Sequence, residues 1–201
     1  MKKIKGRVLS SVLTLFVLLS FCLVPVKSWA GNLDVLVFGN YDFLSPNGGA
    51  IAQGSTESWQ GQWHNGYGGG LGLLYWFSPR FGFRIDAQGN FFGMNQPGES
   101  LDSAPITGGI EYKLSDGLDH YAYVVLDAGV AYELSLPGIS SIAISASNGG
   151  HAWSSYFDGG LGYNFSFLFA EIKYAYIQDP VPNLPGQNAM WYIPVTVGFN
   201  F

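Results

Sequence analysis

Three histidines, and the serines that follow one of them, are the residues of this 201-residue chain that could most readily do chemistry. His64, His120 and His151 could each accept a proton, and a histidine beside a serine can activate its hydroxyl for hydrolysis. The spacing argues against such a pair. On a strand, Ser154 faces away from His151, and Ser155 lies about 13 Å farther along at ~3.3 Å per residue. We therefore expect no catalytic residue and no enzymatic activity.

Sites for metals and cofactors are not indicated either. A metal site needs clustered histidine, cysteine or carboxylate ligands, and the sequence shows no such cluster. Paired glycines recur at Gly69-Gly70, Gly108-Gly109 and Gly159-Gly160, and a glycine-rich loop can hold a phosphate. That loop requires a strand before it and a helix after it, whereas these glycines lie within expected strands. We interpret them as space for close packing, and expect no metal and no cofactor.

The charged residues follow a regular alternation with apolar ones. Between positions 81 and 92, Phe83 and Ile85 share one face with other apolar residues, whereas Arg84 and Asp86 share the other. The same period of two recurs over 106–114, 121–134, 153–165 and 168–178, and it is typical of strands. A soluble β-sandwich would bury the apolar face, and a membrane barrel would expose it to lipid. Alternation alone does not distinguish the two.

Eight expected strands and the lengths of their connections favour the barrel. The strands are expected at Leu33–Leu44, Tyr67–Phe77, Phe81–Phe92, Ile106–Leu114, Tyr121–Leu134, Trp153–Phe165, Leu168–Gln178 and Met190–Phe201. Long polar connections follow the first, third, fifth and seventh strands, and short turns follow the second, fourth and sixth. An even number of strands with short periplasmic turns and long outer loops is typical of outer-membrane barrels.

The N-terminal segment indicates export. A basic start at Lys2 to Arg7 precedes a mostly apolar stretch, and Ser28-Trp29-Ala30 is a suitable cleavage site, so residues 1–30 are expected to form a cleaved signal peptide. The barrel domain would then span 31–201. Cleavage removes the only cysteine and five of nine Lys/Arg, and leaves a formal net charge of about −10. Such acidity argues against nucleic acid as a partner.

The last residues complete the pattern. Phe201, Phe199, Val197 and Val195 alternate with more polar residues up to the final position. The segments 169–174 and 197–201 resemble the last two strands of small eight-stranded outer-membrane barrels of the OmpA and OmpX type, and the resemblance covers about 31–201. It implies an all-β, eight-stranded antiparallel up-and-down transmembrane barrel, with Phe199 and Phe201 as the assembly signal. We expect no periplasmic domain after it.

The resemblance also implies a location and partners. The location is the outer membrane of a Gram-negative type of cell, and the partners are outer-membrane lipid and lipopolysaccharide, with the barrel-assembly machinery and periplasmic chaperones during biogenesis. We expect a monomer. The function expected is non-enzymatic: envelope integrity or surface interaction through the outer loops. The alternative is a narrow channel or receptor for small hydrophobic molecules, of the OmpW type, and a lipid-modifying enzyme is a third.

The interior of an eight-stranded barrel is narrow enough to be filled by side chains. The charged residues on the inner face are expected to form a packed network: Arg84, Asp86, Glu111, Lys113, Asp127, Glu133, Asp158, Glu171 and Lys173. Buried charges need partners, and antiparallel strands bring Arg84 near Glu111, and Lys173 near Asp158. The excess of acids could be balanced by water, by a bound cation or by a proton held on a carboxyl group. Aromatic residues such as Trp63 and Trp153 are expected to form the interfacial girdle.

Overall fold

The eight strands and most of the short turns are described by a computed structural model, which covers residues 33–45, 48–49, 63–94, 100–115, 117, 119–135, 151–180 and 189–201. The expected signal peptide, residues 1–30, and most of the long connections lie outside these ranges, including Trp59 and the isoleucines at 139, 142 and 144. No helix within these ranges is long and apolar enough to cross a membrane.

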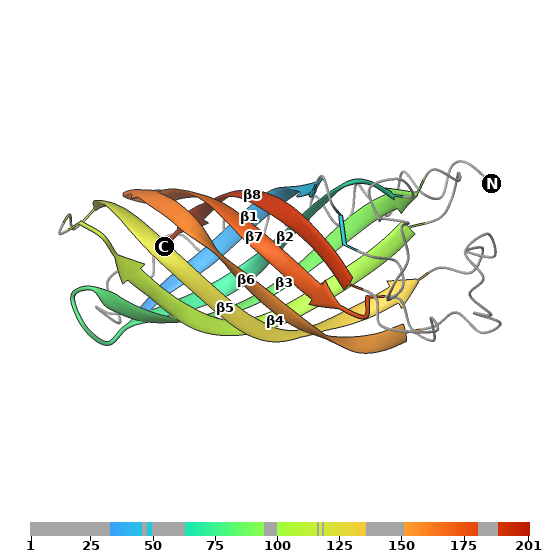
Figure 1. Cartoon of the computed structure of the whole chain (residues 1–201). Helices are drawn as coiled ribbons and strands as arrows, with labels where there is room; N and C mark the ends of the chain where they lie inside the picture. The colour runs from blue at the N-terminus through green and yellow to red at the C-terminus, as the bar shows by residue number, and fades with distance from the viewer. Residues whose placement is uncertain are drawn as a thin grey trace.

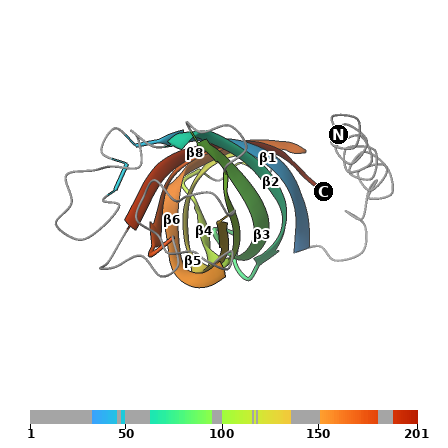
Figure 2. The same cartoon turned by 90° about the vertical axis from the view of Figure 1, so that its right-hand side faces the viewer.

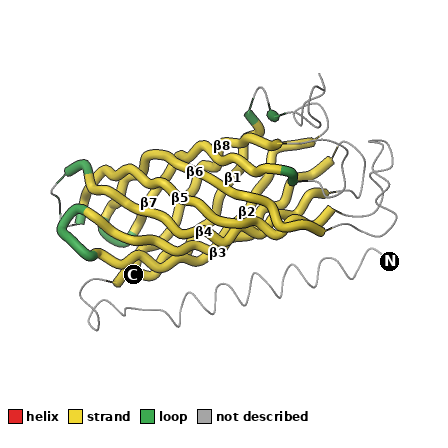
Figure 3. The backbone as a smooth tube through the Cα atoms, turned by 60° about the horizontal axis from the view of Figure 1, so that its bottom comes forward, coloured by secondary structure: helices red, strands yellow, loops and turns green. Residues whose placement is uncertain are grey.

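The strands form one closed antiparallel barrel in which each strand pairs with its neighbours in sequence and β1 pairs with β8 (Figures 1 and 2). The eight strands have the following bounds: β1 Leu33–Leu44, β2 Trp63–Trp76, β3 Phe81–Met94, β4 Ser100–Lys113, β5 His120–Ser135, β6 His151–Phe165, β7 Leu168–Gln178 and β8 Ala189–Asn200. Among the described residues, Figure 3 shows only strands, turns and loops. The predicted fold, an eight-stranded all-β barrel, is confirmed.

The short turns and the C-terminus lie at one end of the barrel, at the left in Figure 1. Ser78 Oγ accepts a hydrogen bond from the Phe81 N–H across the turn between β2 and β3. Phe201 exchanges two backbone hydrogen bonds with Val35, each 3.0 Å long, which extends the closing pair beyond β8. We call this the short-turn end, and the opposite end the long-connection end.

The strand β4 begins at Ser100, six residues before the start that the sequence predicts, because the strand continues through Pro105. Pro105 pairs with Ala131 of β5, whereas its other side, toward Gln88 of β3, is a gap in the ladder. Proline has no N–H to donate, so it is tolerated in a strand where one side of the ladder is interrupted. Pro194 of β8 repeats the arrangement, with pairing to Asp42 of β1 and a gap toward β7.

Outer and inner faces separate as the alternation predicts. Large apolar side chains cover the outside of the barrel, and Leu161 and Ile172, which are cross-strand partners, are 56% and 54% exposed. Their sequence neighbours on the inner face, such as Glu171 and Lys173, are buried. A closed sheet satisfies its backbone groups from within, so an apolar outer face is the arrangement that a lipid environment requires.

Candidate functional site

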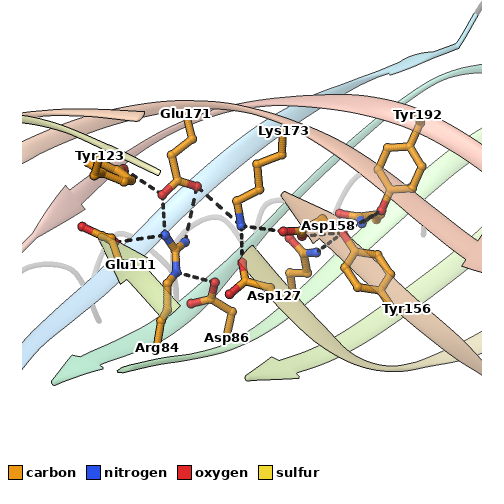
Figure 4. Close-up of polar contacts among 12 residues, drawn as sticks. Arg84, Asp86, Glu111, Tyr123, Asp127, Tyr156, Asp158, Glu171, Lys173 and Tyr192 are labelled. Atoms are coloured by element: carbon orange, nitrogen blue, oxygen red, sulfur yellow. Dashed lines mark hydrogen bonds and ion pairs between the residues drawn. The ribbon is translucent and has the colours of Figure 1, made fainter. Parts of the chain in front are cut away.

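The centre of the lumen is organised around Arg84 of β3 (Figure 4). Its Nε lies 2.6 Å from Asp86 Oδ2, its two terminal nitrogens bond both carboxylate oxygens of Glu171, and its Nη1 lies 3.8 Å from Glu111 Oε2. Only 1% of the Arg84 side chain is exposed. A guanidinium is suited to this position, because its five N–H donors can serve several carboxylates from one plane.

Lys173 of β7 forms the second cationic centre. Its Nζ lies 2.7 Å from Asp127 Oδ2, 3.3 Å from Asp158 Oδ1 and 3.7 Å from Glu171 Oε2. Glu171 therefore joins the two cations, and Tyr123 donates a further hydrogen bond of 2.8 Å to it. The structure thus places Arg84 close to Glu111, and Lys173 close to Asp158.

Uncharged polar side chains continue the network toward the long-connection end. Asp158 accepts a hydrogen bond from Tyr156, which accepts one from Tyr192, which in turn accepts one from Asn90. Asn40 of β1 then joins Asn90 to Asp42, with Nδ2 distances of 3.1 and 2.6 Å. A connected set of buried polar groups therefore extends from the Arg84 cluster to Asp42. Such a set fixes the side chains of seven strands relative to one another.

Inner-face glycines make room for the charged side chains. Gly109 is the cross-strand partner of Asp127, and a Cβ added to it would overlap Asp127 Oδ1 and the Leu126 backbone oxygen. Gly72 stands opposite Asp86 in the same way, and Gly160 stands opposite Lys173. The recurring glycines thus allow charged side chains to lie against the barrel wall, which is a structural role.

Apolar layers lie on both sides of the charged cluster. At the long-connection end, the lumen is filled by a buried cluster of Leu44, Trp63, Phe92, Leu101, Ala131, Tyr156, Ala175, Ile177, Met190 and Tyr192. At the short-turn end, Leu36, Phe38, Leu74 and Phe169 pack together with Trp76. The charged cluster of Arg84 and Lys173 therefore lies between two mainly apolar layers, and Tyr156 and Tyr192 belong both to the first layer and to the polar network.

One predicted role for an aromatic residue was wrong. Trp63 is only 3% exposed and belongs to the inner apolar layer, not to an outer girdle. The register of β2 against β3 shifts between Trp63 and Gly66, which reverses the face that Trp63 presents. Trp153, in contrast, is 65% exposed and packs against Tyr132 on the outer face, with 5.2 Å between ring centroids.

Lys113 lies apart from the acidic cluster, near the short-turn end. Its Nζ is 3.9 Å from the centre of the Trp76 ring and 4.0 Å from that of Tyr121. The Trp76 Nε1–H donates a 2.9 Å hydrogen bond to Asp34. Lys113 is only half-buried, and its partners are aromatic faces that attract the ammonium. Lys113 therefore fills the mouth of the lumen, where its charge also acts on Glu111 and Asp34.

The remaining predicted site residues are dispersed. Glu133 of β5 is fully buried and lies near the long-connection end of its strand, away from Arg84 and Lys173. Ser103 donates a 2.8 Å hydrogen bond to it. His64 and His120 lie on exposed positions at opposite ends, and the side chain of His151 lies outside the described residues. Ser154 donates to the backbone oxygen of Asp179. In the described part of the chain, no three His, Cys, Asp or Glu residues are grouped to hold a metal ion.

Sequence reasoning missed the uncharged half of the network and the apolar layers. Tyr156 and Tyr192 are among the largest fully buried side chains, and Asn40 and Asn90 connect them to Asp42. A signal was present: alternation breaks down toward the long-connection end, where pairs such as Phe91-Phe92 and Tyr176-Ile177 put apolar residues on both faces. Consecutive apolar residues, which occupy both faces of a strand, indicate that the lumen is packed with apolar side chains at that level.

The sequence matches no protein-family model and no curated protein, but solved structures match it. Neisserial surface protein A superposes with a TM-score of 0.53 at 12% identity, over 84% of this chain and 97% of that one. Ail, the attachment invasion locus protein of Yersinia pestis, solved in complex with the heparin analogue sucrose octasulfate, superposes with a TM-score of 0.50 at 14% identity, over 85% and 99%. The chain therefore has the fold of the small eight-stranded outer-membrane barrels, as its resemblance to them predicts.

Proposed function

We propose that this chain is a non-enzymatic outer-membrane protein that supports envelope integrity or surface interaction, with its long connections on the cell surface. The apolar outer face supports the membrane location, because a water-exposed surface of this extent and hydrophobicity would aggregate. The short turns and Phe201 would then face the periplasm, as in barrels of this class.

The filled lumen is the observation that argues against a transport role. The Arg84 and Lys173 network occupies its centre, and apolar layers lie on both sides. The cavity beside Arg84 and Glu111 has a volume of about 10 Å³, enough for roughly one water molecule. Ions would have to shed their water to pass the apolar layers, which is costly.

The composition of the connections limits what the surface can bind. After position 30, the Lys and Arg residues are Arg80, Arg84, Lys113 and Lys173, and none of them lies in 45–62, 95–99, 136–150 or 179–188. Arg80 lies in the short turn after β2, and the other three belong to strands. Ail was solved with a sulfated sugar, but connections without cations favour neutral or cationic partners instead. We expect no retention of this protein on immobilised heparin at physiological salt.

Two experiments test the proposal. The purified, folded protein should give no stepwise conductance in planar lipid bilayers, and reproducible single-channel steps would support the narrow-channel alternative instead. An epitope tag inserted in 136–150 should be detected on intact cells, whereas a tag between Gly117 and Asp119 should be detected only after the outer membrane is permeabilised. Equal detection of both tags in permeabilised cells alone would contradict the proposed orientation.

The enzymatic alternative is tested separately. Lipid A and phospholipids from cells that express the wild-type chain should have the same mass spectra as those from cells that express a His151→Ala, Ser155→Ala variant. New acylated or deacylated species that appear only with the wild-type chain would show that the protein modifies lipid.

A further inference from the structure

The central cluster of the lumen has more acids than cations. Arg84 and Lys173 are its two cations, and they contact five carboxylates: Asp86, Glu111, Asp127, Asp158 and Glu171. All seven residues are at most 8% exposed. Uncompensated charge is unfavourable in an interior from which water is largely excluded, so something must balance the excess.

Two of the five acids, Asp127 and Asp158, share one cation. They are direct cross-strand partners on the inner faces of β5 and β6, so their side chains project side by side. Their carboxyl groups are held close together, because both contact the same ammonium group, that of Lys173. Asp127 Oδ1 is buried and receives no hydrogen bond from any donor of the described residues, and Asp158 Oδ1 has only its ion pair with Lys173.

The neighbouring groups do not supply a second positive charge to the pair. Tyr156 already donates its hydroxyl to Asp158 Oδ2. Arg84 is engaged by Glu171 and Asp86, and Lys173 is shared with Glu171. The titratable and charged groups that surround the pair are Arg84 and Asp86 of β3, Glu111 of β4, Tyr123 of β5, Tyr156 of β6, Glu171 and Lys173 of β7 and Tyr192 of β8. A cation site is not indicated, because no three acids of the described residues are grouped to hold a metal.

We propose that Asp127 and Asp158 form a proton-binding site in which one proton is shared between the two carboxyl groups. Two buried carboxylates held side by side repel each other, whereas a carboxyl group and a carboxylate attract each other through a shared proton. Asp127 is the closer partner of Lys173, with 2.7 Å between its oxygen and Nζ against 3.3 Å for Asp158, so the proton is assigned to Asp158. Asp158 holds the proton and donates it to Asp127. The site thereby reduces the charge excess at the centre of the lumen.

Infrared spectroscopy of the folded barrel in lipid vesicles at pH 7 tests the site directly. A protonated carboxyl group has a carbonyl band that is resolved from those of carboxylates and amides, and aspartate labelled with carbon-13 at its side-chain carboxyl shifts the aspartate component. The wild-type protein should show a label-sensitive protonated band. Asp158→Asn should remove a component of it, and so should Asp127→Asn, because without its partner Asp158 becomes a carboxylate beside Lys173.

The control is Asp102→Asn, at a half-buried position near the beginning of β4, which should leave the band unchanged. Absence of any label-sensitive protonated band in the wild-type protein would overturn the proposal without the need for a variant. A band that persists undiminished in both Asp127→Asn and Asp158→Asn would overturn it as well. A third result would also overturn it: the urea midpoint of the wild-type protein falls when sodium is replaced by choline, and Asp158→Asn abolishes this fall. A bound cation, and not a proton, would then balance the pair. None of these results bears on the membrane location.

Discussion

Replacement of Arg84 by alanine is the most direct test of the charged network. Arg84 contacts Asp86, Glu111 and Glu171, and none of these four residues is more than 3% exposed. Removal of one partner from a buried ion pair leaves the other charge uncompensated, and this costs about 3–5 kcal/mol in the free energy of unfolding. We expect the Arg84→Ala loss to lie in that range, because Lys173 is near enough to compensate only part of the charge on Glu171.

The assay is equilibrium unfolding in urea, with the protein in lipid vesicles and the loss of barrel structure followed by tryptophan fluorescence and heat-modifiable gel mobility. Arg80→Ala, in an exposed turn, is the matched control and should change the free energy by no more than about 0.5 kcal/mol. The double variant Arg84→Met, Glu171→Leu should recover only part of the loss, because an apolar pair can replace the ion pair with Glu171 but Asp86 and Glu111 remain without their cation. A loss below about 1 kcal/mol for Arg84→Ala would put this residue in the range of surface ion pairs and refute the buried network.

Three further predictions concern other parts of the barrel. Phe201→Ser should impair assembly while export continues, and a normal amount of heat-modifiable protein in the outer membrane would contradict the role of Phe201 as an assembly signal. Leu161→Arg should destabilise the barrel by roughly 2–4 kcal/mol in lipid, and Leu161→Ala much less, whereas similar urea midpoints would show that Leu161 does not face lipid near the midplane. Gly109→Ala should cost about 1–3 kcal/mol, because the added Cβ overlaps Asp127 and the backbone of Leu126. Gly89→Ala, where nothing lies within 4 Å of an added Cβ, should be nearly neutral, and equal unfolding midpoints for the two glycine variants would disprove the packing argument.

The strands and their faces could be read from the sequence because alternation is a local property. A side chain at position i in a strand shares its face with position i+2, whatever the strand pairs with. Arg84 and Asp86 therefore had to lie on the face opposite to Phe83 and Ile85, and the structure places them so. Neighbouring strands joined by short turns also have a predictable register, which is why Lys173 of β7 could be matched with Asp158 of β6.

Contacts across the lumen could not be read in this way. Arg84 of β3 bonds Glu171 of β7, a residue 87 positions away, and Lys173 bonds Asp127 of β5 across the strand between them. These contacts depend on how the sheet curls and on the stagger at which β1 meets β8, and both follow from the pairing of all eight strands together. The hydrogen bonds that join Tyr192, Tyr156 and Asn90 depend on the same closure.

Two local irregularities of the strands could not be predicted from the sequence either. A register shift turned Trp63 inward, and a gap in one ladder allowed Pro105 to lie within β4. Both depend on the neighbouring strand and not on the residue itself. The sequence by itself determined the strands, their two faces and their up-and-down antiparallel order, because these follow from the period of the pattern and the lengths of the turns. Only the tertiary structure decided which acid meets which cation and where apolar layers close the lumen, because a closed sheet brings together residues that no local pattern connects.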